Sequence, residues 1–142
     1  MRFIKTAGLP FLILGLFLVA VTSGCVSAPK PSTATDQQLQ PSGQLVDGVR
    51  VIKMEAKKYE FVPNPMIVRQ GEKVRLEVTS LDVDHGISIP AYKISRKLSP
   101  GKLEVIEFTA EQSGSFPTHC SVFCGMGHMG MSGELVVLPS GR

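Results

Sequence analysis

The chain has 142 residues, of which 15 are basic and 12 are acidic, and it contains no tryptophan. Two of the basic residues, Arg2 and Lys5, lie near the start, so the formal net charge of +3 falls to +1 when residues 1–24 are set aside. A nearly neutral domain without a Lys/Arg-rich run lacks the basic surface on which nucleic acids bind. We therefore expect no nucleic-acid partner and, from the length, a single small domain.

The first segment has the composition of an export signal. Its two basic residues precede an apolar stretch over residues 9–21, which is shorter than the roughly 20 residues that a membrane-spanning helix needs. Small residues then lead into Cys25, as at the cleavage site of a lipoprotein. We expect residues 1–24 to be a removable signal peptide and Cys25 to be acylated; the alternative is an uncut signal anchor. Either way, the domain would be membrane-anchored and face the periplasm or the extracellular side.

The segment after Cys25 has a composition that favours disorder. Residues 27–44 are dominated by Pro, Ser, Thr, Ala and Gln, which bury too little apolar surface to offset the entropy of ordering. We expect the acylated cysteine and a disordered linker to cover residues 25–46. One domain over residues 47–139 would follow.

The domain region is predicted to be all-β. Residues 74–79 alternate apolar with polar side chains, which places Val74, Leu76 and Val78 on one buried face. Further runs of strand-forming residues are bounded by Gly and Pro turn signals. The expected strands lie within residues 49–56, 66–69, 74–79, 82–89, 103–109, 115–119 and 135–138. Short strands separated by turns indicate an antiparallel sandwich or barrel.

A loop near the C-terminus carries a dense group of soft donors. From Cys120 to Met131 the sequence reads C-S-V-F-C-G-M-G-H-M-G-M. Thiolates and thioethers are soft donors and imidazole is borderline, so this set favours copper over Mg, Ca or Mn. Zinc bound by two cysteines and two histidines is chemically allowed, although zinc has no use for a nearby Met. A disulfide between Cys120 and Cys124 is a third interpretation, but it would close only a very small ring.

The loop lacks a donor from elsewhere in the chain, and His85 is the candidate. Period-two alternation places His85, Ile87 and Ile89 on one inward face of a strand. An inward histidine is often no more than a hydrogen-bonded core residue. In a sandwich, however, strands that are distant in the sequence end side by side at one pole, where His85 could meet the Cys120 loop.

Three further residues are not expected to be metal ligands. If Cys120 points towards a metal, strand alternation turns His119 to the opposite face. Met126 and Met129 are expected to fill gaps in a packed loop, as flexible thioethers do, in preference to binding copper directly. They could still assist copper loading.

The order of these donors resembles the binuclear CuA site of cytochrome c oxidase subunit II and of the C-terminal domain of nitrous oxide reductase. One-copper blue sites carry a single ligating cysteine, whereas this loop has two. The resemblance covers about residues 49–138 and implies a cupredoxin-like fold, an antiparallel Greek-key β-sandwich or barrel. Other segments in the family's order are Tyr59-x-Phe61-x-Pro63, Ile67-Val68-Arg69-Gln70-Gly71 and the turn from Thr79 to Gly86.

The resemblance also implies a donor set for a binuclear copper centre with two Cu ions. The two bridged ions would share one added electron, so that each bond length changes little on reduction. The implied donors are the bridging thiolates of Cys120 and Cys124, the terminal imidazoles of His85 and His128, the weak axial thioether of Met131 and the backbone carbonyl of Val122.

These expectations describe a membrane-tethered electron-transfer protein without a catalytic site of its own. It would act as a reduced subunit II that admits electrons to a haem-copper oxidase catalytic subunit, or as a free shuttle to another redox enzyme. Cytochrome c or a similar redox protein would be the donor. Two features depart from the oxidase pattern: Val122 replaces a carboxylate that reaches a magnesium ion in many oxidase subunits, and no Trp is present for donor docking. Copper binding or copper delivery by the same ligands is the alternative.

Overall fold

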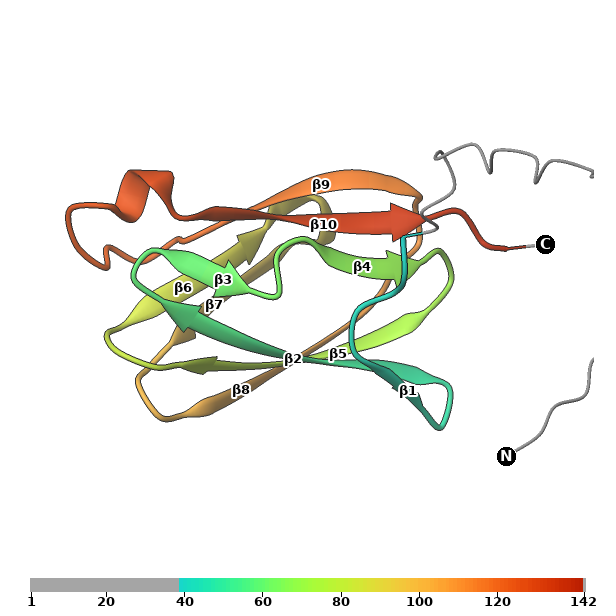
Figure 1. Ribbon diagram of the computed structural model, residues 1–142, viewed down its shortest axis with the longest axis horizontal. Helices are drawn as coiled ribbons and strands as arrows, with labels where there is room; N and C mark the ends of the chain where they lie inside the picture. Colours follow the sequence, from blue (N-terminus) through green and yellow to red (C-terminus); the bar gives the residue numbers. More distant parts are fainter. Residues whose placement is uncertain (1–38, 142) are drawn as a thin grey trace, which may run out of the picture. The chain divides into compact units, whose positions relative to one another are not determined.

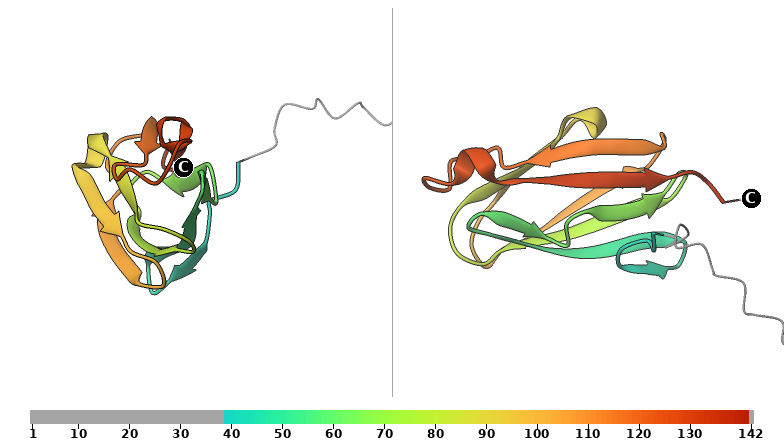
Figure 2. Two further views of the ribbon diagram at one scale, coloured as in Figure 1. Left: turned by 90° about the vertical axis from the view of Figure 1, so that its left-hand side faces the viewer. Right: turned by 45° about the horizontal axis from the view of Figure 1, so that its top comes forward.

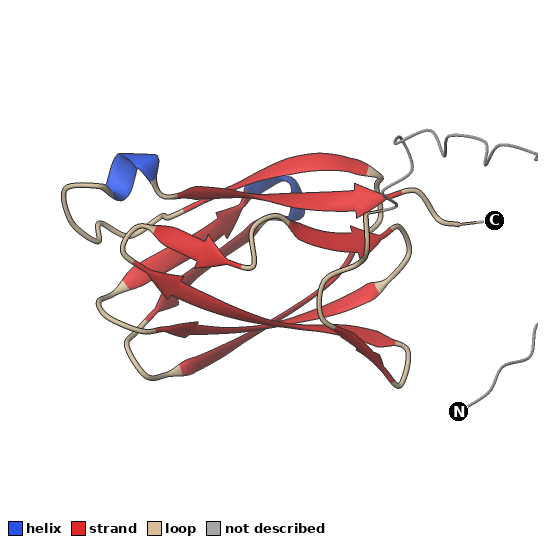
Figure 3. Ribbon diagram, in the orientation of Figure 1, coloured by secondary structure: helices blue, strands red, loops and turns tan. Residues whose placement is uncertain are grey.

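Residues 39–141 are described by the computed structural model, and they form two β-sheets that face each other (Figures 1 and 2). The first sheet contains β1 (Gln44–Val46), β2 (Val49–Lys57), β3 (Glu60–Val62), β5 (Lys73–Ser80) and β8 (Leu103–Thr109). The second sheet contains β4 (Met66–Arg69), β6 (His85–Ile89), β7 (Ile94–Leu98), β9 (Gly114–His119) and β10 (Ser132–Leu138). Two short 3-10 turns connect strands, η1 (Pro90–Tyr92) and η2 (His128–Gly130) (Figure 3).

The predicted signal peptide, Cys25 and the first part of the predicted linker lie outside the described residues. Within residues 39–141 there is no helix with the length and apolar character needed to cross a bilayer.

The predicted all-β sandwich is confirmed, and each strand expected from the sequence is present. The first sheet has the order β1-β2-β5-β8 with β3 also beside β2, and the second has the order β4-β10-β9-β6-β7. Two pairs, β2 with β5 and β4 with β10, are parallel and depart from the antiparallel expectation. Between β2 and β5 the chain passes to the other sheet through β4, and a parallel pair requires a crossover of this kind.

Three strands, β1, β3 and β7, were not expected from the sequence. β1 occupies residues 44–46, the end of the segment expected to be linker. A turn at Asp47 (φ 48°) and Gly48 (φ 79°) joins β1 to β2, and this pair of positive φ angles is what a two-residue hairpin turn needs. β7 gives no period-two signal, because only its end residues, Ile94 and Leu98, are buried.

The alternation in β5 builds the core as predicted, since Val74, Leu76 and Val78 are at most 2% exposed.

The two ends of the sandwich contain different loops and chain segments. The loop between β9 and β10 lies at one end, together with the turns after β2, β5 and β7, whereas residues 39–43 and 139–141 lie at the other end (Figure 1). The expected donors and the ends of the described segment are therefore at opposite ends.

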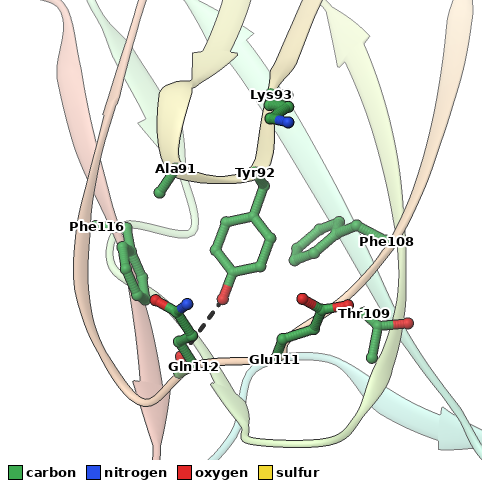
Figure 4. A pocket seen from close by; sticks show the side chains of 8 residues that line it. All are labelled: Ala91, Tyr92, Lys93, Phe108, Thr109, Glu111, Gln112 and Phe116. Carbon is green, nitrogen blue, oxygen red and sulfur yellow. Dashed lines mark hydrogen bonds between the residues drawn. The ribbon is translucent and has the colours of Figure 1, made fainter.

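A groove of about 330 Å³ is lined by residues of η1, β8, β9 and the turn between β8 and β9 (Figure 4). The Tyr92 ring packs against Phe108 and Phe116, with centroid separations of 5.0 and 5.3 Å. Its hydroxyl donates a hydrogen bond to the carbonyl of Gln112 at 3.4 Å. These contacts extend the core at the edge of the sandwich, and the groove is separate from the donor loop.

One charged pair ties the start of β2 to the turn before β5. Arg50 donates two hydrogen bonds to Glu72, at 2.6 and 3.1 Å, and the Glu72 carboxylate also accepts the Arg69 backbone N–H at 3.0 Å. Partial burial raises the pKa of Glu72, but these hydrogen bonds and the Arg50 charge outweigh it and hold the pKa below its ordinary 4.5. The carboxylate therefore stabilises the fold above about pH 4.5, and that stabilisation is lost as the pH falls through the folded-state pKa.

Glu72→Gln is expected to lower the free energy of unfolding at pH 7 by about 1–3 kcal/mol, because it weakens charge-assisted hydrogen bonds between side chains that are only 12% and 15% exposed. Urea unfolding at pH 7 and at pH 3 measures the free energy of unfolding. The difference in this free energy between the variant and the unsubstituted chain should be smaller at pH 3. Glu107→Gln is the matched control, since its pair with Arg75 is 47% and 62% exposed. Equal losses in the two variants at pH 7 would contradict the assignment.

Candidate metal centre

The expected donors come from one strand and one loop of the second sheet. His85 begins β6, and Cys120 directly follows β9. β6 and β9 are neighbours in register, with Ser88 opposite His119, so the strand that carries His85 lies beside the strand that leads to Cys120. Strand alternation predicted the inward direction of His85 correctly, because the residue is 0% exposed.

The sulfur of Cys120 lies at the centre of one half of the site. Its Sγ is 3.8 Å from His85 Nδ1, 3.8 Å from Cys124 Sγ and 3.1 Å from the carbonyl oxygen of Val122. Both cysteines are 5% exposed. Two thiols, an imidazole nitrogen and a backbone carbonyl therefore converge in a nearly buried space.

The sulfur of Cys124 lies at the centre of the other half. Its Sγ is 3.7 Å from His128 Nδ1 and 3.7 Å from Met131 Sδ. Met131 is 1% exposed, and its N–H donates to the His128 carbonyl at 3.1 Å across η2. The structure thus brings together all the donors that the sequence predicted within the described residues, and their role as ligands remains a prediction.

The sulfur separation fits a shared metal and does not fit a disulfide. Tetrahedral coordination with metal–sulfur bonds of about 2.3 Å spaces two sulfurs about 3.8 Å apart. A disulfide needs about 2.05 Å, and Cys120 and Cys124 are free thiols at 3.8 Å. The residues present therefore suit a thiolate-bridged metal centre.

The two histidines lie beside different sulfurs. His85, Cys120 and Cys124 have donor atoms that all lie within 4.8 Å of one another. Among residues 39–141 this group does not extend to His128, which contacts Cys124. A single zinc tetrahedron would crowd both histidines around one point, so the arrangement disfavours that interpretation.

The surroundings of the Cys124 thiol favour its protonated form. Burial raises its pKa above the ordinary 9.0, and the adjacent Cys120 raises it further. Metals bind the thiolate form, so metal binding at Cys124 is expected to release a proton.

Asp82 is a candidate functional residue that the sequence analysis missed. His85 Nε2–H donates to the Asp82 carboxylate at 2.8 Å, and the same carboxylate accepts the backbone N–H groups of Lys58 at 2.8 Å and Val83 at 2.7 Å. Burial raises the pKa of Asp82, but these hydrogen bonds dominate and lower it to about 2. The ionised carboxylate holds the His85 proton on Nε2, which leaves the Nδ1 lone pair directed towards Cys120. The Asp-x-x-His spacing of Asp82 and His85 was the sequence signal that could have indicated this contact.

Asp82→Asn is expected to weaken copper binding by about 10–100-fold, because the amide no longer favours the required tautomer of His85. Competition with a chromogenic copper chelator measures the affinity. Asp84→Asn is the control, since the Asp84 carboxylate pairs with Lys97 at the surface, whereas the carboxylate hydrogen-bonded to the His85 ring is that of Asp82. Equal affinity in the Asp82 and Asp84 variants would show that Asp82 does not orient the ligand.

Of the two expectations about side chains next to the donors, the one for His119 is correct and the one for Met126 and Met129 is wrong. His119 is exposed and faces away from the donors, as strand alternation predicted. The expectation that Met126 and Met129 fill gaps in a packed loop is wrong, because they are 94% and 92% exposed. The Tyr59 ring occupies the space beneath this part of the loop, where a Cβ added at Gly125 would lie 2.6 Å from its hydroxyl oxygen.

Residues 34–137 match the family model of the periplasmic domain of cytochrome c oxidase subunit II. The chain belongs to this family. Its resemblance to the CuA-domain cupredoxins is therefore confirmed, and the family assignment makes the domain extracytoplasmic. The anchoring segment predicted near Cys25 lies outside the described residues.

The chain aligns with different fractions of the length of its individual relatives. It is 25% identical over 135 residues to a cytochrome c oxidase subunit 2 of Thermus thermophilus, covering 88% of this chain and 80% of that protein. It is 31% identical over 99 residues to nitrous-oxide reductase of Stutzerimonas stutzeri, covering 66% of this chain and 16% of that enzyme. The periplasmic domain of oxidase subunit II from Bradyrhizobium japonicum shares the fold, with a TM-score of 0.61, 24% identity and coverage of 68% and 89% of the two chains.

Proposed function

We propose that this chain transfers single electrons through a binuclear CuA-type copper centre, outside the cytoplasm and tethered to a membrane. The arrangement of donors on both sides of a sulfur pair carries the proposal. His85 lies beside Cys120 and His128 lies beside Cys124, while the sulfurs are 3.8 Å apart. Two bridged ions require two sulfurs between them and one terminal nitrogen for each ion, and these side chains provide that donor set. The soft thiolates favour copper.

The weak donors complete each half of the proposed centre. The Val122 carbonyl oxygen is 3.1 Å from Cys120 Sγ, and Met131 Sδ is 3.7 Å from Cys124 Sγ. Because Val122 contributes through its backbone, the absence of a side-chain carboxylate does not remove this donor. What the side chain cannot do is bind a magnesium ion at a contact with a catalytic subunit.

When bound, a pair of copper ions supplies one-electron redox chemistry. The chain's part is to hold the donors so that little moves when the charge changes. Cys120 N–H donates to the Met131 carbonyl at 3.0 Å, which ties the two ends of the loop together. His85 is held from behind by Asp82 at 2.8 Å. Fixed ligands in a nearly buried site keep the reorganisation on electron transfer small.

The tether is proposed at Cys25, from the apolar segment and small residues that precede it. Residues 39–43 join the sandwich at the end opposite the donor loop (Figure 1). Mass spectrometry of the mature chain tests the proposed tether. A chain that begins at an acylated Cys25 supports the tether, and an unmodified Cys25 still preceded by residues 1–24 contradicts it.

The proposed partners are redox proteins that dock at the donor end. Phe123 is 73% exposed there and its ring packs edge-on against the His128 imidazole, with centroids 5.7 Å apart. An apolar side chain in contact with a proposed ligand suits close approach by cytochrome c or a similar donor, or by the catalytic subunit of a haem-copper oxidase. The matched oxidase subunits support this class of partner.

Copper delivery is the second candidate, and the exposed thioethers of Met126 and Met129 favour it. Repeated oxidation and reduction of the copper-loaded full chain separates the two functions. An electron-transfer protein should retain its copper and spectrum through the cycles. A delivery protein should instead lose copper to a copper-free acceptor protein when reduced, and it should not cycle reversibly.

A further inference from the structure

We propose that Met126 and Met129 form an outer, transient binding site for Cu(I) through which the buried centre is loaded. The inference rests on the proposed copper function and extends it to the route by which the metal enters. It concerns two side chains outside the proposed donor set.

These two methionines do not pack into the core of the domain. The other methionines of the described domain, Met54, Met66 and Met131, are 1–2% exposed, as expected for a flexible apolar side chain. Met126 and Met129 are 94% and 92% exposed. Their thioethers are therefore free to meet a soft metal from solution, and thioether sulfur is a Cu(I) ligand.

The backbone around Met126 forces this exposure. A Cβ at Gly125 would lie 2.6 Å from the Tyr59 hydroxyl oxygen, and a Cβ at Gly127 would clash with the Tyr59 ring. The glycines on both sides of Met126 thus face Tyr59, and the Met126 side chain between them extends outwards. Gly130 has no heavy atom within 4 Å of an added Cβ, so the loop is open to solvent beside Met129 as well.

His128 connects the outer thioethers to the buried sulfurs. It lies between Met126 and Met129 in the sequence, is half-buried, and has its Nδ1 3.7 Å from Cys124 Sγ. The donors thus run from exposed thioether to half-buried imidazole to buried thiol. Because thiolate binds Cu(I) more strongly than thioether, transfer along this series is favourable.

The transfer step involves no electron transfer. A bond between Cu(I) and a methionine thioether breaks as a bond between Cu(I) and the Cys124 sulfur forms. The thiol proton of Cys124 passes to water, and copper stays in the Cu(I) state. Any later oxidation of the loaded centre is a separate event.

The double variant Met126→Leu/Met129→Leu tests the inference, because leucine keeps the apolar surface and removes both sulfurs. Side chains more than 90% exposed are not needed for folding. The rate of Cu(I) transfer from its coloured bicinchoninate complex to the reduced full chain is measured by stopped flow. We expect loading about tenfold slower than in the unsubstituted chain, with the final copper content and spectrum unchanged.

Met66→Leu is the matched control, since it removes a thioether that is 2% exposed, and its loading rate should not change. Equal loading rates for the double variant and the unsubstituted chain would overturn the entry site while leaving the proposed function intact. Failure of the unsubstituted chain to take up copper would overturn both.

Discussion

Replacing Cys124 by Ser is expected to abolish the shared-electron spectrum and to lower the copper content from two ions to about one per chain. Cys124 Sγ is the atom that contacts Cys120, His128 and Met131, at 3.7–3.8 Å. A serine hydroxyl is a harder donor that does not bridge soft metals in this way. The variant therefore separates His128 and Met131 from the donors around Cys120. Electron paramagnetic resonance and metal analysis measure the two effects.

Val122→Ala is the control for this experiment. Its proposed contribution is a backbone carbonyl 3.1 Å from Cys120 Sγ, so truncating its side chain should preserve both the copper content and the spectrum. If Cys124→Ser kept the shared-electron spectrum, the bridging role of Cys124 would be wrong. If Val122→Ala destroyed it, the position would act through its side chain.

Replacing Gly86 by Ala is expected to disrupt the centre although Gly86 donates nothing to it. A Cβ at this buried position would lie 2.9 Å from the backbone nitrogen of Val122 and would also clash with the Ser121 hydroxyl. The hydroxyl can rotate away, but the backbone cannot move without displacing the loop next to Cys120. We expect a loss of about 1–3 kcal/mol in the free energy of unfolding. Copper affinity should fall by about 10–100-fold as the donors shift.

Gly130→Ala, in the loop between β9 and β10, is the matched control, because an added Cβ there meets no heavy atom within 4 Å. Its effect on stability should stay within about 0.5 kcal/mol. Urea unfolding and chelator competition provide the two readouts. Equal behaviour of the two alanine variants would show that the close approach of β6 to the loop does not position the donors.

Much of the fold was predictable because most strands follow one simple period. In β5 and β6 the inward residues alternate with polar ones or glycine, and the buried faces predicted for both strands are correct. β7 was not predictable in this way, since three exposed residues separate its buried ends. The parallel pairing of β2 with β5 was also beyond the local sequence, because it depends on the excursion through β4 to the other sheet.

The donor set was easier to predict than its surroundings. The loop places Cys120, Cys124, His128 and Met131 within one short stretch of sequence, and strand alternation supplied His85. The support of His85 by Asp82 depends on how the turn before β6 folds, which also brings the Lys58 N–H to the same carboxylate. No periodic pattern encodes that contact.

The methionines show a different limit of sequence reasoning. Thioether chemistry is compatible with packing and with copper binding, so Met126 and Met131 are indistinguishable by residue type. Their exposed fractions, 94% and 1%, separate them completely. The difference arises from Tyr59, which comes from the turn between β2 and β3 and fills the space under Gly125 and Gly127.

Electron paramagnetic resonance of the copper-loaded, unsubstituted chain tests the central claim most directly. Metal analysis of the same sample gives the number of copper ions per chain. The proposed centre predicts two ions and hyperfine structure from one unpaired electron shared equally by two copper nuclei. A single copper ion per chain with the hyperfine structure of one nucleus would contradict the proposed binuclear centre.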